Sequence, residues 1–169
     1  MKTISAVTDI LAQENPRIAI TEGEERLYFI VGLFGFCQGE AMVLNWMRAH
    51  VKNYEGGFWD FWEIKPGFSG KTGPHMDLTT SATGYISPPD DQRYNVSLPG
   101  NYFESEMSAD AVGIVATLYV LNQLSWKTSE MGARYEKLCR SLIQRQDALK
   151  DYIDIVQHPE SRLIYQTID

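Results

Sequence analysis

Cysteine, histidine and the motifs of common cofactor sites are scarce in this chain of 169 residues. Its two cysteines, Cys37 and Cys139, are too few for a disulfide framework and form no CxxC pair, as is typical of a reducing compartment. The three histidines, His50, His75 and His158, lie far apart and lack a metal-ligand spacing such as HxxxH. The glycines form neither GxGxxG nor a phosphate loop. We therefore expect no metal site and no cofactor.

The chain also lacks a membrane segment and a cluster of basic residues. Its longest apolar stretches, around residues 27–36 and 111–124, are interrupted or shorter than the roughly 20 apolar residues that cross a bilayer. Fifteen basic residues are interleaved with 22 acidic ones, for a formal net charge of −7, which disfavours direct binding to nucleic acid phosphates. We expect a cytoplasmic monomer or weak dimer that binds neither membrane nor nucleic acid.

Composition and apolar spacing predict the architecture. With 44% hydrophobic and 22% charged residues, the chain has the composition of one globular domain spanning residues 1–169. The spacing of apolar residues predicts a short helix that ends before Asn15-Pro16, a last helix over about 160–167, and longer helices over 39–53, 109–126 and 135–156. Ser108 is positioned to cap the 109–126 helix, and Asp110 lies near the positive dipole end of that helix.

Strands are expected between these helices. Aromatic and alternating apolar residues predict strands over 58–64, 93–98 and 102–106, with a possible further strand near 75–80. Residues 22–36 are compatible with a buried strand or a strained helix, and residues 66–91 combine sheet with long loops. The predicted fold class is α+β, with helices packed on a small antiparallel sheet.

Two groups of acidic side chains are candidate contacts for a partner protein. Glu104, Glu106 and Asp110 cluster near a predicted helix start. Three further aspartates lie opposite the apolar stripe of the 135–156 helix: Asp147, Asp151 and Asp154. A solvated helix face is the favoured interpretation of the second group, and dipole stabilisation worth about 0.3 to 1 kcal/mol is the favoured interpretation of Asp110.

Four separated stretches resemble one protein family: GEAMVLNWM at 39–47, YEGGFWDFWEI at 54–64, EMSADAVGIVATLYVLNQL at 106–124 and HPESRLIYQTID at 158–169. They resemble the ArdB/KlcA antirestriction proteins of bacterial plasmids and genomic islands. The third and fourth stretches are the most specific. The resemblance implies a single α+β domain that relieves type I restriction of incoming DNA, and it implies no catalytic site.

Three hypotheses follow for the function. The first is a non-enzymatic factor that contacts the host type I restriction-modification machinery or a host regulator of it. The second is DNA mimicry, against which the charge speaks: one DNA turn of about 34 Å carries on the order of 20 charges, whereas the chain nets −7. The third is a small enzyme that uses Cys37, His75 or a carboxylate such as Asp77 of the 66–91 loops, although no acid, base and nucleophile converge there.

Overall fold

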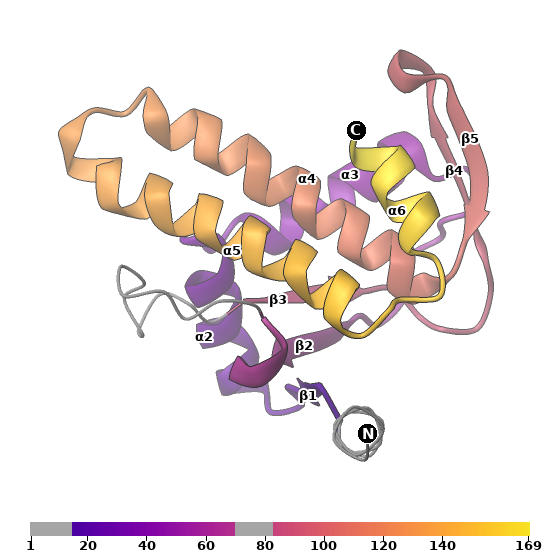
Figure 1. Ribbon diagram of the computed structural model, residues 1–169, viewed down its shortest axis with the longest axis horizontal. Coiled ribbons are helices and arrows are strands. Elements are labelled where there is room, and N and C mark those ends of the chain that lie inside the picture. Colours follow the sequence, from indigo (N-terminus) through magenta and orange to yellow (C-terminus); the bar gives the residue numbers. More distant parts are fainter. Residues whose placement is uncertain (1–14, 70–82) are drawn as a thin grey trace, which may run out of the picture.

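The computed structural model describes residues 15–69 and 83–169 of the chain (Figure 1). The predicted first helix and the possible strand near residues 75–80, with His75 and Asp77, lie outside the described residues. The helices and strands are β1 (Arg17–Ala19), α2 (Gly23–Phe34), α3 (Gly39–His50), β2 (Asp60–Ile64), β3 (Gly84–Ser87), β4 (Tyr94–Leu98), β5 (Phe103–Met107), α4 (Ala109–Ser129), α5 (Glu136–Ile155) and α6 (Ser161–Ile168).

Helix α4 is the centre of the fold. Its N-cap is Ser108, as predicted, whose hydroxyl accepts a hydrogen bond from the Ala111 amide at 3.1 Å. Its buried residues lie on more than one side: Ile114 and Leu118 share one side of the helix, and Val112 and Ala116, on another side, are buried as well. The reason is that α3, α5, α6 and β3 surround the helix (Figure 1). A helix that is apolar on all sides needs this complete cover.

Helix α4 and strand β3 approach each other very closely. A Cβ atom added at Gly113 would lie 2.5 Å from the Ile86 carbonyl oxygen and 2.6 Å from Ser87 Cα, so only glycine fits there. Nearby, the Ile86 amide donates a hydrogen bond to the Thr117 hydroxyl of α4 at 3.3 Å. The helix thereby provides an acceptor for a backbone group at the edge of the sheet.

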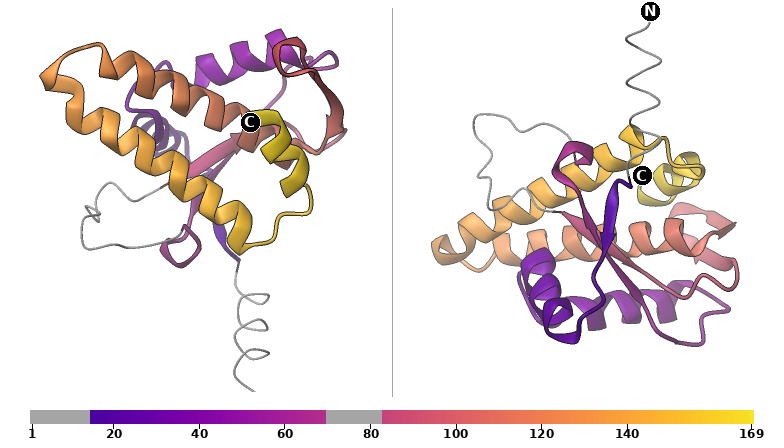
Figure 2. Two further views of the ribbon diagram at one scale, coloured as in Figure 1. Left: turned by 45° about the horizontal axis from the view of Figure 1, so that its top comes forward. Right: turned by 90° about the horizontal axis from the view of Figure 1, so that it is seen from below.

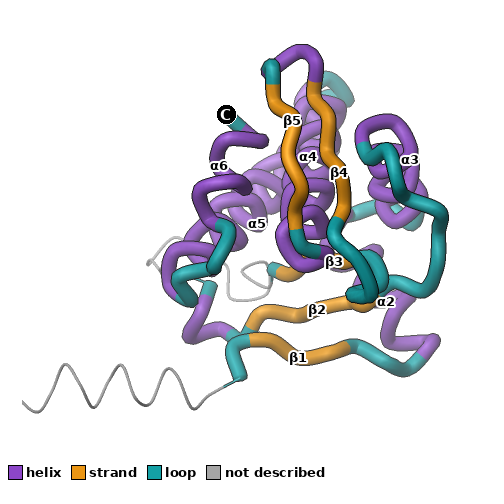
Figure 3. Tube along the Cα trace, turned by 90° about the vertical axis from the view of Figure 1, so that its right-hand side faces the viewer, coloured by secondary structure: helices purple, strands orange, loops and turns teal. Residues whose placement is uncertain are grey.

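The strands form two antiparallel sheets, where the sequence predicted one. The first has the order β1-β2-β3, with Arg17 opposite Ile64 and Trp62 opposite Tyr85. It lies across one side of the α4–α5 pair, with α2 and α3 beside it (Figure 2). The second is the β4-β5 hairpin, which stands between α3 and α6 (Figure 3). The α+β class is confirmed.

Helix α2 settles the structure of residues 22–36, for which the sequence left strand and helix open. Ile30, Leu33 and Phe34 are buried at helical spacing, and Gly35 ends the helix with a left-handed φ of 74°. Three further apolar side chains of the same helix are exposed: Leu27, Tyr28 and Val31.

Among the described residues, no single helix is long and apolar enough to cross a membrane. Helices α2 and α3 reach that length and composition only as a pair, and the pair is bent by 76°.

Candidate functional site

Asp110, in the first turn of α4, is the hub of a polar cluster drawn from four segments. One carboxylate oxygen, Oδ1, accepts a hydrogen bond from the Tyr85 hydroxyl of β3 at 2.6 Å and pairs with the Arg17 guanidinium of β1. The other oxygen, Oδ2, lies 2.7 Å from Nε2 of His158, in the turn before α6. These residues, Arg17, Tyr85, Asp110 and His158, are called the Asp110 cluster below. The Asp110 side chain is 30% exposed, so the cluster reaches the surface.

A second carboxylate, that of Glu160, lies beside the cluster and holds the turn that carries His158 against the start of α4. The His158 Nδ1 atom accepts a hydrogen bond from the Glu160 amide at 3.0 Å, so the ring proton sits on Nε2 and is donated to Asp110. The Glu160 carboxylate accepts from the Ser108 amide at 2.9 Å and from Arg93 Nη2 at 2.6 Å. The start of α4 and the turn that leads into α6 are therefore joined by two acidic side chains.

The environment keeps both carboxylates ionised. Burial acts to raise the pKa of Asp110, but hydrogen bonds from His158 and Tyr85 and the charge of Arg17 outweigh it, and the pKa lies below its ordinary value. Burial likewise acts to raise the pKa of Glu160, and the hydrogen bonds from Ser108 and Arg93 bring that pKa below its ordinary value too. Burial and the adjacent Asp110 charge raise the pKa of the Tyr85 hydroxyl, so Tyr85 stays a donor.

Arg17 is held from a second direction by an aromatic ring. Its guanidinium carbon lies 3.6 Å from the ring centroid of Trp62, and the Trp62 indole N–H donates to the Ser87 hydroxyl at 2.9 Å. The guanidinium is thus fixed between a carboxylate and an aromatic face. Contacts within the chain therefore fix the position of this guanidinium.

The cluster is not arranged for acid–base or nucleophilic chemistry. Both ring nitrogens of His158 are occupied by Asp110 and the Glu160 amide, so neither is free to take a proton from a substrate. Cys37 is exposed, and the half-buried Cys139 thiol donates to the Ser125 carbonyl at 3.3 Å. Within residues 15–69 and 83–169, no group of three or more His, Cys, Asp or Glu residues is placed to hold a metal ion.

The first predicted acidic group lies beside this cluster. Glu104 and Glu106 are exposed on β5, and both are paired with cations: Glu104 with Lys52 at 2.7 Å and Glu106 with Arg93 at 3.9 Å. Arg93 connects Glu106 to Glu160 and so to the Asp110 cluster. The pairing of the two glutamates with basic residues lowers the net negative charge of this surface.

The second predicted group, Asp147, Asp151 and Asp154, is exposed on α5 as the helical pattern indicated. Asp154 accepts a hydrogen bond from the Tyr165 hydroxyl of α6 at 2.9 Å. No ion pair within the described residues connects this face to the Asp110 cluster. Helix α5 approaches the cluster through the Tyr152 ring, whose centroid lies 6.0 Å from that of the Tyr85 ring.

Sequence reasoning selected only one member of the cluster, Asp110. It treated Ser108 as a helix cap and His158 as a histidine without metal-ligand spacing, and it did not select Arg17, Tyr85 or Glu160. A signal was nevertheless present. The two stretches that resemble a known family most specifically, 106–124 and 158–169, are the ones that meet at Asp110, His158 and Glu160.

Fold and cluster together define a small α+β protein with an internally paired polar cluster at its surface. A model of a family described as antirestriction protein matches residues 52–169. Two Escherichia coli proteins named antirestriction protein KlcA are 34% and 32% identical to this chain, covering 92% and 93% of it and 95% and 98% of their own lengths. The chain belongs to the antirestriction protein family.

A solved structure agrees with this membership. It comes from work on the KlcA and ArdB proteins, described as showing a novel fold and antirestriction activity against type I DNA restriction systems in vivo but not in vitro. It matches this chain with a TM-score of 0.68 and 31% sequence identity, over 93% of this chain and 98% of its own. The resemblance seen in the sequence is confirmed across nearly the whole chain.

Proposed function

We propose that this chain relieves host type I restriction of incoming unmodified DNA as a non-enzymatic protein of a mobile element. It acts in the host cytoplasm by contacting a protein, either the restriction machinery or a host regulator of it. The observation that carries the proposal is the Asp110 cluster, in which the two most family-specific stretches are bound together at the surface by Asp110, His158 and Glu160.

The distribution of charge argues against DNA mimicry. A mimic needs an unbroken series of carboxylates at phosphate-like intervals, on the order of 20 charges per DNA turn of about 34 Å. Around the Asp110 cluster the carboxylates are paired with basic residues: Glu104 with Lys52, Asp110 with Arg17, and both Glu106 and Glu160 with Arg93. Such a mixed surface supports contact with a protein of complementary charge pattern.

The related KlcA and ArdB proteins support the same reading. Their activity is described in vivo but not in vitro. A DNA mimic occupies the DNA groove of the enzyme directly and needs no other cellular component. Loss of the effect outside the cell therefore favours an indirect contact or one that needs a further host component.

The function is tested by plating unmodified phage on cells that carry a type I system, with and without this protein. Expression should raise the plating efficiency of unmodified phage and leave that of modified phage unchanged, because modified DNA is not attacked. An unchanged plating efficiency for unmodified phage would remove the assignment.

The contact surface is tested by removing charge in matched pairs. Replacing Glu104 and Glu106 together by glutamine should reduce protection, because Glu106 is connected to the Asp110 cluster through Arg93 and Glu104 is exposed on the same strand. The matched control replaces the exposed Glu24 and Glu130 by glutamine, with the same loss of two charges, and should protect like wild type. If the Glu24 and Glu130 variant lost protection while the Glu104 and Glu106 variant kept it, this placement of the contact would be refuted.

The second acidic surface is tested in the same cells. A triple change of Asp147, Asp151 and Asp154 to asparagine should leave protection intact if the Asp110 cluster surface makes the contact. Loss of protection by the folded triple variant alone would place the contact on α5 instead.

DNA mimicry is tested with purified restriction enzyme. The protein should not compete with DNA for the enzyme in cleavage or binding assays at low salt. Tight competition that weakens steeply as salt rises is the signature of phosphate replacement and would overturn the proposed mode of action.

A further inference from the structure

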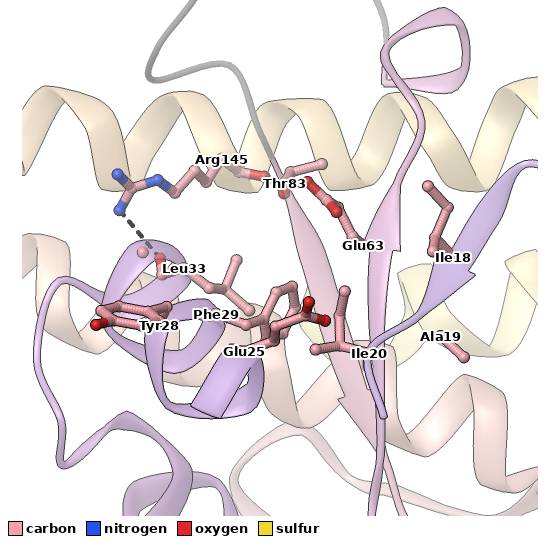
Figure 4. Close-up of a pocket in the computed structure, with 11 residues that line it drawn as sticks. Ile18, Ala19, Ile20, Glu25, Tyr28, Phe29, Leu33, Glu63, Thr83 and Arg145 are labelled. Carbon is pink, nitrogen blue, oxygen red and sulfur yellow. Dashed lines mark hydrogen bonds between the residues drawn. The ribbon is translucent and has the colours of Figure 1, made fainter. Parts of the chain in front are cut away.

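Two cavities outside the Asp110 cluster differ in their surroundings. The first, of about 570 Å³, lies between α2, the β1-β2-β3 sheet and α5, and its lining holds charges of both signs: Glu25, Glu63 and Arg145 (Figure 4). The second, of about 240 Å³, lies in the seam between α4 and α5 and is lined in part by Trp126 and Ile143, which are 68% and 46% exposed. The first cavity favours no single ligand charge. The second borders apolar side chains that face water, as in a surface that binds another protein.

Ile143 is the centre of a stripe of charged residues on α5. Five residues spaced three or four apart share one face of this helix: Glu136, Arg140, Ile143, Asp147 and Lys150. Along the stripe the residues are negative, positive, apolar, negative and positive. The four charged side chains form no ion pair within the described residues 15–69 and 83–169. Their charges are therefore available to a partner.

The order of the charges makes the stripe complementary to itself in the antiparallel direction. A two-fold axis that crosses α5 at Ile143 places the residues before this position opposite the residues after it in a second copy. Glu136 and Lys150 each lie seven residues from Ile143, and Arg140 and Asp147 lie three and four residues from it. At a rise of about 1.5 Å per residue, the members of each pair match along the helix to within roughly 1.5 Å. Each acidic residue therefore lies opposite a basic residue of the second copy.

Parallel pairing of two copies has the opposite outcome. It would place every charged residue of the stripe opposite the same residue of the second copy, and like charges in contact repel. The charge pattern thus favours both a partner and a direction. The partner is the chain itself, and the direction is antiparallel.

We propose that this face of α5 binds a second copy of the chain, with Ile143 at the two-fold axis and Trp126 of α4 against its flank. Two packed helices lie about 8 to 10 Å apart, which brings the four pairs of opposite charge within reach of each other. One helix face buries less than the roughly 800 Å² per partner of a standard interface, so the dimer is weak, with a dissociation constant on the order of 10 to 100 µM. The inference does not use the proposed function and is tested on the purified chain.

The first measurement is sedimentation equilibrium of the full-length chain. Its weight-average mass should rise from that of the monomer toward twice that value between roughly 5 and 500 µM, a range that spans the expected dissociation constant. A monomer at every concentration would leave this face to a partner of another kind and would overturn the proposal.

Charge reversal tests the pairing. Arg140→Glu and Asp147→Arg each place like charges opposite each other at two points of the dimer, so each should weaken association by about tenfold. The double variant restores opposite charges in reversed order and should associate to within about threefold of wild type. The two single changes shift the net charge in opposite directions, so an effect of net charge alone would weaken one variant and strengthen the other.

The matched control is Lys137→Glu, which changes the net charge as Arg140→Glu does. Lys137 is exposed on the same helix but lies about 100° around it from Glu136, the first residue of the stripe. The Lys137→Glu variant should associate like wild type. Equal association by wild type and both single charge-reversal variants, or no recovery in the double variant, would overturn the proposal.

A cysteine at the two-fold axis tests the register. A disulfide needs Cα atoms within about 7 Å, a distance that residues at the axis of a helix pair can reach. In a background of Cys37→Ser and Cys139→Ser, which removes both native thiols, Ile143→Cys should form a covalent dimer on oxidation. Lys137→Cys in the same background should stay monomeric on a denaturing gel. Equal cross-linking at the two positions would contradict the proposed axis.

Discussion

Changing Asp110 to asparagine should destabilise the protein, because this carboxylate serves three donors at once. An asparagine oxygen can still accept from Tyr85 and Arg17, but its amide group then faces the Nε2–H of His158. The ring cannot relieve this conflict by moving its proton. The proton would sit on Nδ1 and face the Glu160 amide, which is also a donor.

The expected loss of stability follows from these contacts. One buried donor without a partner costs about 1 to 3 kcal/mol. Loss of the charge opposite Arg17 adds roughly 1 kcal/mol, a small value because both side chains are more than a quarter exposed and solvent screens the pair. A total of about 3 kcal/mol corresponds to a urea midpoint lowered by roughly 1 to 2 M and a melting temperature lowered by about 6 to 12 °C.

The measurement is urea unfolding at pH 7, followed by tryptophan fluorescence, which reports on Trp62 beneath Arg17. The matched control is Asp151→Asn, at an exposed position of α5, which should change the free energy of unfolding by less than about 0.5 kcal/mol. An Asp110→Asn protein as stable as the Asp151→Asn protein would show that the cluster is not the hub described above.

Two further predictions concern packing and pH. Gly113→Ala should lower the free energy of unfolding by at least about 2 kcal/mol, because its Cβ would meet the Ile86 carbonyl oxygen at 2.5 Å. Gly32→Ala, in open space on α2, should raise the free energy of unfolding by roughly 0.5 to 1 kcal/mol, because alanine favours a helix more than glycine does. Equal effects of the two substitutions in urea unfolding would contradict this prediction. The pKa values of Asp110 and Glu160 are lowered by folding, so the stability they contribute is complete above their ordinary values near pH 4 and is lost as the pH falls through the lower folded-state values. Urea midpoints measured from pH 6 to pH 2 should therefore fall more steeply for wild type than for Asp110→Asn, and parallel curves would contradict the assignment.

The elements with a strong local signal could be predicted from the sequence. Ser108 marks the start of α4 by its capping hydroxyl, and the alternation of Tyr94, Val96 and Leu98 marks β4, whose burial alternates in the same way. The helices α3, α5 and α6 begin and end within a few residues of the predicted bounds. In each case the signal lies within the element itself.

Other elements depend on distant parts of the chain. All four residues of β3 (Gly84–Ser87) are buried, so the strand has no alternation of apolar and polar residues, and its position was missed. Strand β1 is three residues long and was also missed, because it is defined by its pairing with β2. Helix α2 was ambiguous because Leu27, Tyr28 and Val31 are apolar on its exposed side and obscure the buried face.

The difference between local signals and contacts with distant parts of the chain also explains which residues of the candidate site could be predicted. Asp110 could be selected from its position at a helix start, where a carboxylate is favoured by the helix dipole. Its partners Tyr85, His158 and Arg17 lie 25, 48 and 93 residues away in the sequence. Only the packing of α4 against the sheet and against α6 brings them together, and no local pattern records that.

The Asp110 cluster exists only while β1, β3, α4 and the turn before α6 are assembled. A synthetic peptide copying either the 106–124 stretch or the 158–169 stretch would carry the side chains of the surface without their arrangement. Detachment of α6 alone would also dissolve the surface while most of the core stayed folded. A host protease or chaperone that captures such partly opened molecules would therefore meet a protein that has lost the cluster but is not globally denatured.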